Sequence, residues 1–388
     1  MRRRLLAVSL GWVGISVVAE GIPALLLPHQ LLAAGERDAT GLGMVTLVTI
    51  ALAALIQPLA GRWSDAVGRW PIVWVGAATA VGGLGLMLIP GLVVPAAVVA
   101  IVGVSVAQAG HQPLLPDLVV PAQRGRGAGL KGVFDVGGAF VGFLVLGAFL
   151  GAGSAVPAVV VLAMLLVVPF AVARRLIGSP ARVGAEAEQA VDGGLAALMA
   201  SRFLFLLGVY VVGRFMLFFV ADRLGLGADE AAAATGLLLA LLALGSAVAA
   251  LPAGWLADRL GRRRLMLGGG LAAGAGMGLM PLADSLAMLG VLGLLIAVGS
   301  AAFSAGNWAA LADRTTTGQV GWQLGVANLA TAGAVALAGA FGIVIDHWGF
   351  AVAFGLASAS AVAGGILAWR DAGTAGAATD LRPAEVTG

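Results

Sequence analysis

Two ionisable residues, Glu20 and Arg214, stand within long apolar stretches of this 388-residue chain. A charged side chain is costly in such a stretch, so its presence is a reason to look for a function. Two opposite charges could form a gate, carry a proton or hold a charged substrate. The structural alternative is an ion pair that only joins two parts of the fold. We therefore take Glu20 and Arg214 as candidate gate or proton-coupling residues.

A second group of candidate residues lies in three other apolar stretches. His111 follows Gln108 in the first, and an imidazole that titrates near neutral pH could carry a proton or bind an anion. The alternative is a histidine that only hydrogen-bonds a neighbouring helix. The candidate residues for lining a cavity are Gln108, Gln112, Asn307, Trp308 and Asn328.

The composition fits a membrane protein and excludes several other classes. The chain is 60% hydrophobic and 11% charged, which leaves too few charged residues to cover a soluble core of this size. A net charge of +3 gives little support to nucleic-acid binding, and the absence of cysteine excludes disulfides and thiolate catalysis. No phosphate-binding loop and no converging catalytic or metal-ligand set is present. We expect no enzyme activity, no cofactor and no metal.

Twelve apolar segments of membrane-spanning length follow one another along the chain, which predicts an all-α membrane protein with 12 transmembrane helices. The run after Met1 resembles a signal peptide, but no convincing small-residue cleavage site follows, so we interpret it as the first helix. The segments lie near 5–28, 40–60, 71–90, 95–117, 129–152, 155–173, 201–221, 232–252, 265–282, 285–311, 323–345 and 349–369.

The basic residues predict the orientation. With the N-terminus in the cytoplasm, only Arg37 and Arg223 fall in outer loops, Arg214 lies in a helix, and the other 19 of the 22 Lys and Arg are inside. We expect a multi-pass protein of a bacterial inner membrane with both termini cytoplasmic. The expected parts are a six-helix bundle over 1–173, a cytoplasmic loop over 174–200, a second bundle over 201–370 and a cytoplasmic tail over 371–388.

A repeated motif relates the two halves. The pattern G-x-x-x-D-x-x-G-R occurs at 61–69 and at 254–262, 193 residues apart, and is expected in the loop after the second helix of each half. A second set of matches has a spacing of 196: Gly110 with Gly306, Asp117 with Asp313, Gly129 with Gly325 and Gly137 with Gly333. Consistent offsets indicate a duplicated, pseudo-symmetric six-helix unit.

With this motif in both halves, the chain resembles the major facilitator superfamily over roughly residues 5–370. The resemblance implies two bundles around a cavity that opens alternately to each side of the membrane. It also implies a cytoplasmic latch that joins the bundles in the outward-facing state; ordinary positive loop charge is the alternative. The implied latch residues are Gly61, Asp65, Gly68, Arg69, Gly254, Asp258, Gly261 and Arg262, with Asp117 and Asp313 as neighbours.

The resemblance implies a secondary transporter rather than a specific substrate. Many drug–proton antiporters of the family have an arginine in helix four and a glycine–proline pair in helix five, and this chain has neither. We expect a proton-coupled carrier of a small organic solute that acts as a monomer, with drug or metabolite efflux slightly favoured. The alternatives are uptake of a sugar or organic acid, or a receptor or scaffold that transports nothing.

Overall fold

The computed structural model describes residues 2–118, 124–178, 193–313 and 320–379, and these residues form helices with no strand among them. A chain in lipid must satisfy its backbone hydrogen bonds internally, and helices do this within each segment. In chain order the elements are α1 (Arg2–Gly21), the π-helix η1 (Ile22–Leu26), α2 (Leu27–Ala33), α3 (Ala39–Val67), α4 (Arg69–Leu86), α5 (Val93–His111), α6 (Leu114–Leu118), α7 (Arg124–Gly151), α8 (Ala155–Ile177), α9 (Gly193–Leu224), α10 (Ala228–Leu260), α11 (Arg262–Leu279), the 3₁₀-helix η3 (Met280–Leu282), α12 (Leu286–Asp313) and α13 (Val320–Thr379).

The membrane-spanning helices follow the apolar segments of the sequence. Ten helical stretches in the described part of the chain are long and apolar enough to cross a membrane. The expected segment 71–90 falls in α4 up to Leu86, where the helix ends, and the last two expected segments lie in α13, which is interrupted at Gly349 (φ 80°, ψ 172°). The all-α membrane fold is therefore confirmed, and its helices are consistent with twelve spans.

The first span stays helical past Pro23 because the α-helix widens there into a π-helical turn. A proline inside a helix has no N–H to donate to the carbonyl four residues earlier, so the regular pattern is broken there. The chain adopts a π-turn over η1, with the N–H of Leu27 donating to the carbonyl of Ile22. α1, η1 and α2 thus form one span, and Glu20 lies directly before the wide turn.

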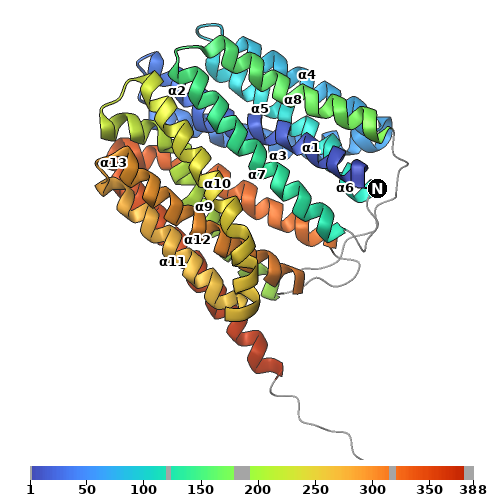
Figure 1. Ribbon diagram of the computed structural model, residues 1–388, viewed down its shortest axis with the longest axis vertical. Coiled ribbons are helices and arrows are strands. Elements are labelled where there is room, and N and C mark those ends of the chain that lie inside the picture. Colours follow the sequence, from blue (N-terminus) through green and yellow to red (C-terminus); the bar gives the residue numbers. More distant parts are fainter. Residues whose placement is uncertain (1, 119–123, 179–192, 314–319, 380–388) are drawn as a thin grey trace, which may run out of the picture.

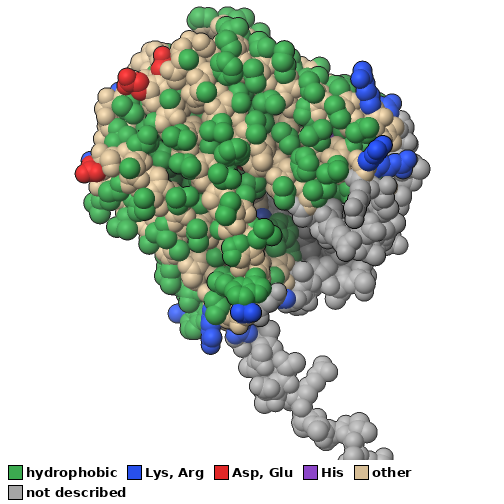
Figure 2. Space-filling view, in the orientation of Figure 1, with side chains coloured by type: hydrophobic (Ala, Val, Ile, Leu, Met, Phe, Trp, Pro, Cys, Tyr) green, Lys and Arg blue, Asp and Glu red, His purple; other side chains and the backbone are tan. Residues whose placement is uncertain are grey.

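The helices form an N-terminal half (α1–α8) and a C-terminal half (α9–α13) whose packing partners repeat. α4 packs on α5 as α11 packs on α12, and α3 packs on α5 as α10 packs on α12. The halves meet where α7 runs along α10 and α3 runs along α13 (Figure 1). Apolar side chains cover much of the outer surface, as a lipid-facing surface requires (Figure 2).

The repeated motif lies largely within helices rather than in loops, which corrects the expectation from the sequence. α3 continues to Val67 and α10 to Leu260, so the turns are confined to Gly68 and Gly261. Both glycines have a positive φ, 105° and 83°, which residues with a side chain rarely adopt. The apolar segments of the sequence end before these helices do, because the last turns of α3 and α10 are polar.

Candidate functional site

We call the side of the molecule that carries Arg2 and the Gly68 turn the N-terminal face, and the other side the opposite face. A cavity of about 340 Å³ lies between the two halves. Helices α1, α3 and α5 line it from the N-terminal half, and α9 and α13 from the C-terminal half. The space-filling view shows the molecule hollowed between its halves (Figure 2). The volume suits a small organic molecule.

Glu20 and Arg214 both line this cavity, on α1 and α9 respectively. Arg214 is only 6% exposed, and its Nε has no hydrogen-bond partner. No nitrogen of Arg214 lies within 4.0 Å of the Glu20 carboxylate in the described structure, so the two charges share the cavity without forming a direct ion pair. A buried guanidinium with a free donor is available to another acceptor.

The rest of the lining is apolar with a few uncharged polar groups. Gln108, a candidate from the sequence, is among them, and the polar groups that were not candidates are Thr46, Thr49, Gln57, Ser105 and Tyr210. Tyr210 is the one tyrosine of the chain and stands four residues before Arg214, so both point to the same side of α9. The four-residue spacing of Tyr210 and Arg214 could have identified Tyr210 as a cavity residue from the sequence. A threonine, serine or glutamine in an apolar helix gives no such indication.

A polar stripe on α1 leads from the N-terminal face toward Glu20. Trp12, Ser16 and Glu20 follow one another at four-residue spacing and therefore share one side of the helix. Lys131 of α7 lies over the Trp12 ring at 3.8 Å and donates to Asp135 at 3.3 Å. Ser16 donates to the same carboxylate. Asp135 is thus the nearest acidic residue to Glu20 on α7, and it is already paired.

The halves are joined at the opposite face. His29 Nε2 lies 2.8 Å from the Asp229 carboxylate across the boundary between the halves. Asp346 of α13 accepts from the backbone N–H groups of Ala39 and Thr40, at 3.2 and 2.7 Å, at the start of α3. These contacts tie the first two spans of one half to α10 and α13 of the other.

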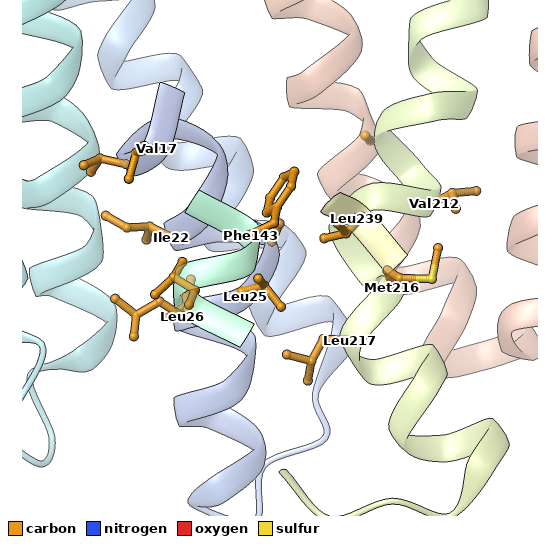
Figure 3. Packing of buried hydrophobic residues seen from close by; sticks show 14 of the residues in the cluster. Val17, Ile22, Leu25, Leu26, Phe143, Val212, Met216, Leu217 and Leu239 are labelled. Carbon is orange, nitrogen blue, oxygen red and sulfur yellow. The ribbon is translucent and has the colours of Figure 1, made fainter. Parts of the chain in front are cut away.

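Two further layers close the same side. Apolar side chains of η1 and α9 fill the space between the halves, including Leu25 and Leu217, which are fully buried (Figure 3). Next to them α3 and α13 meet backbone to backbone: a Cβ on Gly43 would lie 1.9 Å from the carbonyl oxygen of Gly339. The cavity thus ends at a closed opposite face and extends along α3 toward Gln57 and Pro58, nearer the N-terminal face.

The comparisons with known proteins agree with this architecture. The family model of the Major Facilitator Superfamily matches residues 198–384, the C-terminal half. No curated protein matches the chain at a significant level of sequence similarity. Over 95–97% of its length the chain shares the fold of three solved transporters, which are described below. The chain thus has a major-facilitator fold, and its C-terminal half matches the model of that superfamily.

Three solved structures give the extent of the likeness. A bacterial homologue of the iron transporter ferroportin in an inward-facing state has a TM-score of 0.70 and 17% identity, over 95% of this chain and 98% of that one. A bacterial homologue of the human lysosomal transporter Spinster, inward-facing and occupied, gives 0.68 and 16%, over 97% and 96%. The human organic anion transporter MFSD10 gives 0.66 and 19%, over 95% and 99%.

In the first copy of the motif, Arg69 binds acceptors of its own half. Arg69 donates to Asp65, to Ser64 Oγ at 3.1 Å and to Asp117 at 3.0 Å, all within the N-terminal half. Partial burial lowers the pKa of Arg69, but hydrogen bonds to Asp65 and Asp117 outweigh it and leave that pKa above its ordinary value. The N-cap residue of α4 is Gly68, and no side chain caps this helix.

The other candidates from the sequence lie away from the cavity or outside the described side chains. Asn307 is buried and accepts from Arg202 at 3.1 Å, and Arg202 also lies over the Trp308 ring at 4.6 Å. Gln112 is exposed at the end of α5. In the second motif copy, Arg262 donates to the Ala309 carbonyl at 2.9 Å and Gly254 lies in α10. The side chains of Asp258, Asp313 and Asn328 lie outside the described residues.

His111 lies in the core of the N-terminal half and does not line the cavity. Its Nε2 is 2.8 Å from the Val8 carbonyl oxygen, and its ring packs against Trp12, Trp70 and Phe170. A Cβ on Gly11 would lie 2.4 Å from the imidazole, so α1 and α5 fit closely around it. This geometry favours the alternative that the sequence left open, a histidine that joins two helices. Among the described residues no group of three or more His, Asp or Glu could hold a metal ion.

Replacing His111 with alanine should lower stability without changing proton coupling. The substitution removes a buried hydrogen bond and leaves a cavity among three aromatic rings, at a cost of about 3 kcal/mol. We expect a lower thermal unfolding midpoint in detergent and unchanged protons moved per solute in liposomes. His347→Ala, at an exposed position, is the matched control. A loss of proton movement with an unchanged unfolding midpoint would contradict the structural role.

Proposed function

We propose that the chain is a proton-coupled secondary transporter of a small organic solute, with Glu20 as the residue that takes up and releases the proton. The observation that carries the proposal is the pairing of one acid and one base in the cavity between the halves, Glu20 and Arg214. The superfamily fold supports a membrane transporter that works by alternating access. A carboxyl group buried in such a cavity can stay neutral or charged depending on what lies beside it.

The arrangement of contacts supports a state in which the cavity faces the N-terminal side. The described contacts that join the halves gather at the opposite face, where His29 meets Asp229 and Asp346 meets the start of α3. If the N-terminus is cytoplasmic, as the basic residues predict, this state is inward-facing. Asp65, Arg69, Asp258 and Arg262 then form the latch of the other state, with Asp117 and Asp313 beside them.

The direction of transport depends on how solute and proton share the cavity. Export by exchange requires that they displace each other, whereas uptake requires that they bind together. Glu20 and Arg214 line the same cavity. When Glu20 is protonated, the positive charge of Arg214 is no longer balanced, so the cavity then favours a negatively charged solute. This favours the uptake of an organic acid, one of the alternatives from the sequence, over the efflux that the sequence slightly favoured. The name of MFSD10, an organic anion transporter, is in line with it.

Proton flux in proteoliposomes tests the proposal. Purified protein is reconstituted with a pH-sensitive dye inside, and organic acids, sugars and amphipathic drugs are added outside. We expect at least one solute to move protons with it, and Glu20→Gln to lose proton movement at least tenfold while solute binding remains. Glu230→Gln, at an exposed acid on α10, is the matched control.

Two outcomes would contradict it. Solute movement without protons in the original protein would exclude proton coupling, and Glu20 would then be a gate residue. Unchanged proton movement in Glu20→Gln would place the proton site elsewhere.

A further inference from the structure

We propose that the cavity binds an amphipathic organic monoanion, such as a carboxylate, through Arg214, and that the negative charge of Glu20 opposes the binding of this anion. The inference rests on the proposed function and adds the class of substrate and the way in which proton and substrate are coupled. Its starting point is the charge inventory of the cavity lining, in which Arg214 is the cation and Glu20 the anion.

Arg214 has the properties of a binding residue whose partner is absent. Arg214 is only 6% exposed, it lines the cavity, and its Nε has no acceptor. A buried unsatisfied donor on a charged group is expensive, so a structural arginine normally has its acceptors built in. A guanidinium presents two parallel N–H groups that match a carboxylate. The free donor therefore indicates an acceptor that arrives with the substrate.

The remainder of the lining sets the body of the substrate. Ala19, Pro23, Ile50 and Ile101 are apolar, and the uncharged polar groups Gln57 and Gln108 stand toward the N-terminal face. Such a lining binds an apolar body with a single charged group better than a molecule covered in hydroxyls. The cavity of about 340 Å³ has room for a molecule of one or two rings.

Charge balance couples the anion to a proton. With Glu20 charged, the cavity holds one positive and one negative group, and an added anion would leave it with a net negative charge in a poorly solvated space. Protonation of Glu20 removes that excess and leaves Arg214 for the anion. Anion and proton thus bind together, and by thermodynamic linkage each tightens the binding of the other.

The other titratable groups near Glu20 do not replace it in this role. Tyr210 and Arg214 face it from α9. Asp135 faces it from α7, where it accepts from Ser16 and Lys131 and is thereby held as a paired carboxylate. Among the described residues, those of α3, α5 and α13 that line the cavity carry no ionisable side chain. Glu20 is therefore the acid whose charge is not already balanced by its own half.

Binding measurements on the purified full chain in nanodiscs test the inference. The probes are 2-naphthoate, its uncharged amide and the matching naphthylmethylammonium, titrated by calorimetry between about pH 5.5 and 7.5 in buffers of different ionisation enthalpy. We expect naphthoate to bind at least tenfold more tightly than the amide or the cation. Its affinity should rise up to tenfold per unit fall in pH, with close to one proton taken up per anion.

Two variants separate the roles of the charges. Arg214→Gln should lose the preference for naphthoate over its amide. Arg214→Lys should keep part of this preference, because lysine keeps the positive charge but lacks the two parallel N–H donors of the guanidinium. Glu20→Gln should bind naphthoate with no pH dependence and no proton uptake. Arg223→Gln, an exposed arginine of the same helix whose Nε donates to the Ala283 carbonyl, is the control and should match the original protein.

The outcomes distinguish this inference from the proposed function. Equal binding of amide and anion, preference for the cation, or no naphthoate binding at millimolar concentration would overturn the anion site while leaving proton-coupled transport of another solute standing. Naphthoate binding that needs Arg214 but takes up no proton would keep the anion site and overturn the opposing role of Glu20. The same result joined to solute movement without protons would overturn the proposed function as well.

Discussion

Replacing Gly339 with valine is expected to lower transport about 100-fold by preventing closure of the opposite face. A Cβ at position 339 would lie 2.4 Å from the carbonyl oxygen of Gly43, which no rotamer change can relieve because the neighbour is backbone. Overpacking of this kind costs about 1–3 kcal/mol, and a fixed backbone contact places it at the upper end. The closed state then becomes about 100-fold less populated, since each 1.4 kcal/mol is about tenfold.

The change in conformation can be measured apart from transport. Leu25 is fully buried in the closed opposite face, so a cysteine introduced there should resist a membrane-impermeant maleimide in the original background. In Gly339→Val the same cysteine should react rapidly, and the chain has no native cysteine to interfere. Gly355→Val is the control, because a Cβ at Gly355 on α13 meets nothing within 4 Å. Normal transport and a protected Leu25→Cys in Gly339→Val would show that α3 and α13 do not close this side.

Arg69→Ala is expected to destabilise the N-terminal half by about 3 kcal/mol, the lower end for breaking a buried ion pair. The side chain of Arg69 is 11% exposed and that of Asp117 is 8% exposed, so the substitution leaves a buried carboxylate without its cation. It also releases Ser64 and Asp65 at the end of α3, where the chain turns at Gly68.

The stability loss should be seen as a lower thermal unfolding midpoint in detergent. Arg62→Ala removes an exposed arginine of α3, seven residues before Arg69, and should leave the midpoint unchanged. Asp65→Asn should cost little, because Asp65 is 67% exposed and Arg69 keeps Asp117. If Arg69→Ala and Arg62→Ala unfold at the same temperature, the Arg69 cluster has no structural role in this state.

Hydropathy and charge were sufficient to predict the membrane fold. Each expected apolar segment lies in a helix, because in lipid both the side chains and the backbone favour the same solution. The ends of helices were less predictable. α3 and α10 each continue through a polar last turn that carries the repeated motif. Hydropathy detects only the part of a helix that lies in the hydrocarbon region, so it does not predict where such a helix ends.

The candidate site could be predicted where charge was the signal and not where packing decided. Glu20 and Arg214 stand out because an ionisable residue in an apolar helix is rare, and both line the cavity. His111 stands out for the same reason, yet it faces the core of its own half. The inward face of α5 is shared between cavity and core: Ser105 lines the cavity, whereas His111, six residues later, packs in the core. The joints at Asp229 and Asp346 were missed because an acid at a helix end is common.

The glycine contact between α3 and α13 has a consequence for how often the halves can part. A joint built from large side chains orders their rotamers on closing, at about 0.5–1.5 kcal/mol for each, and must release them on opening. Gly43, Gly339 and Gly342 bring no rotamers to this joint, so its closing carries no side-chain entropy cost. The backbone contact, the apolar layer of η1 and α9 and the His29 and Asp346 hydrogen bonds then hold this side closed. The joint is therefore suited to opening and closing many times at a low free-energy difference.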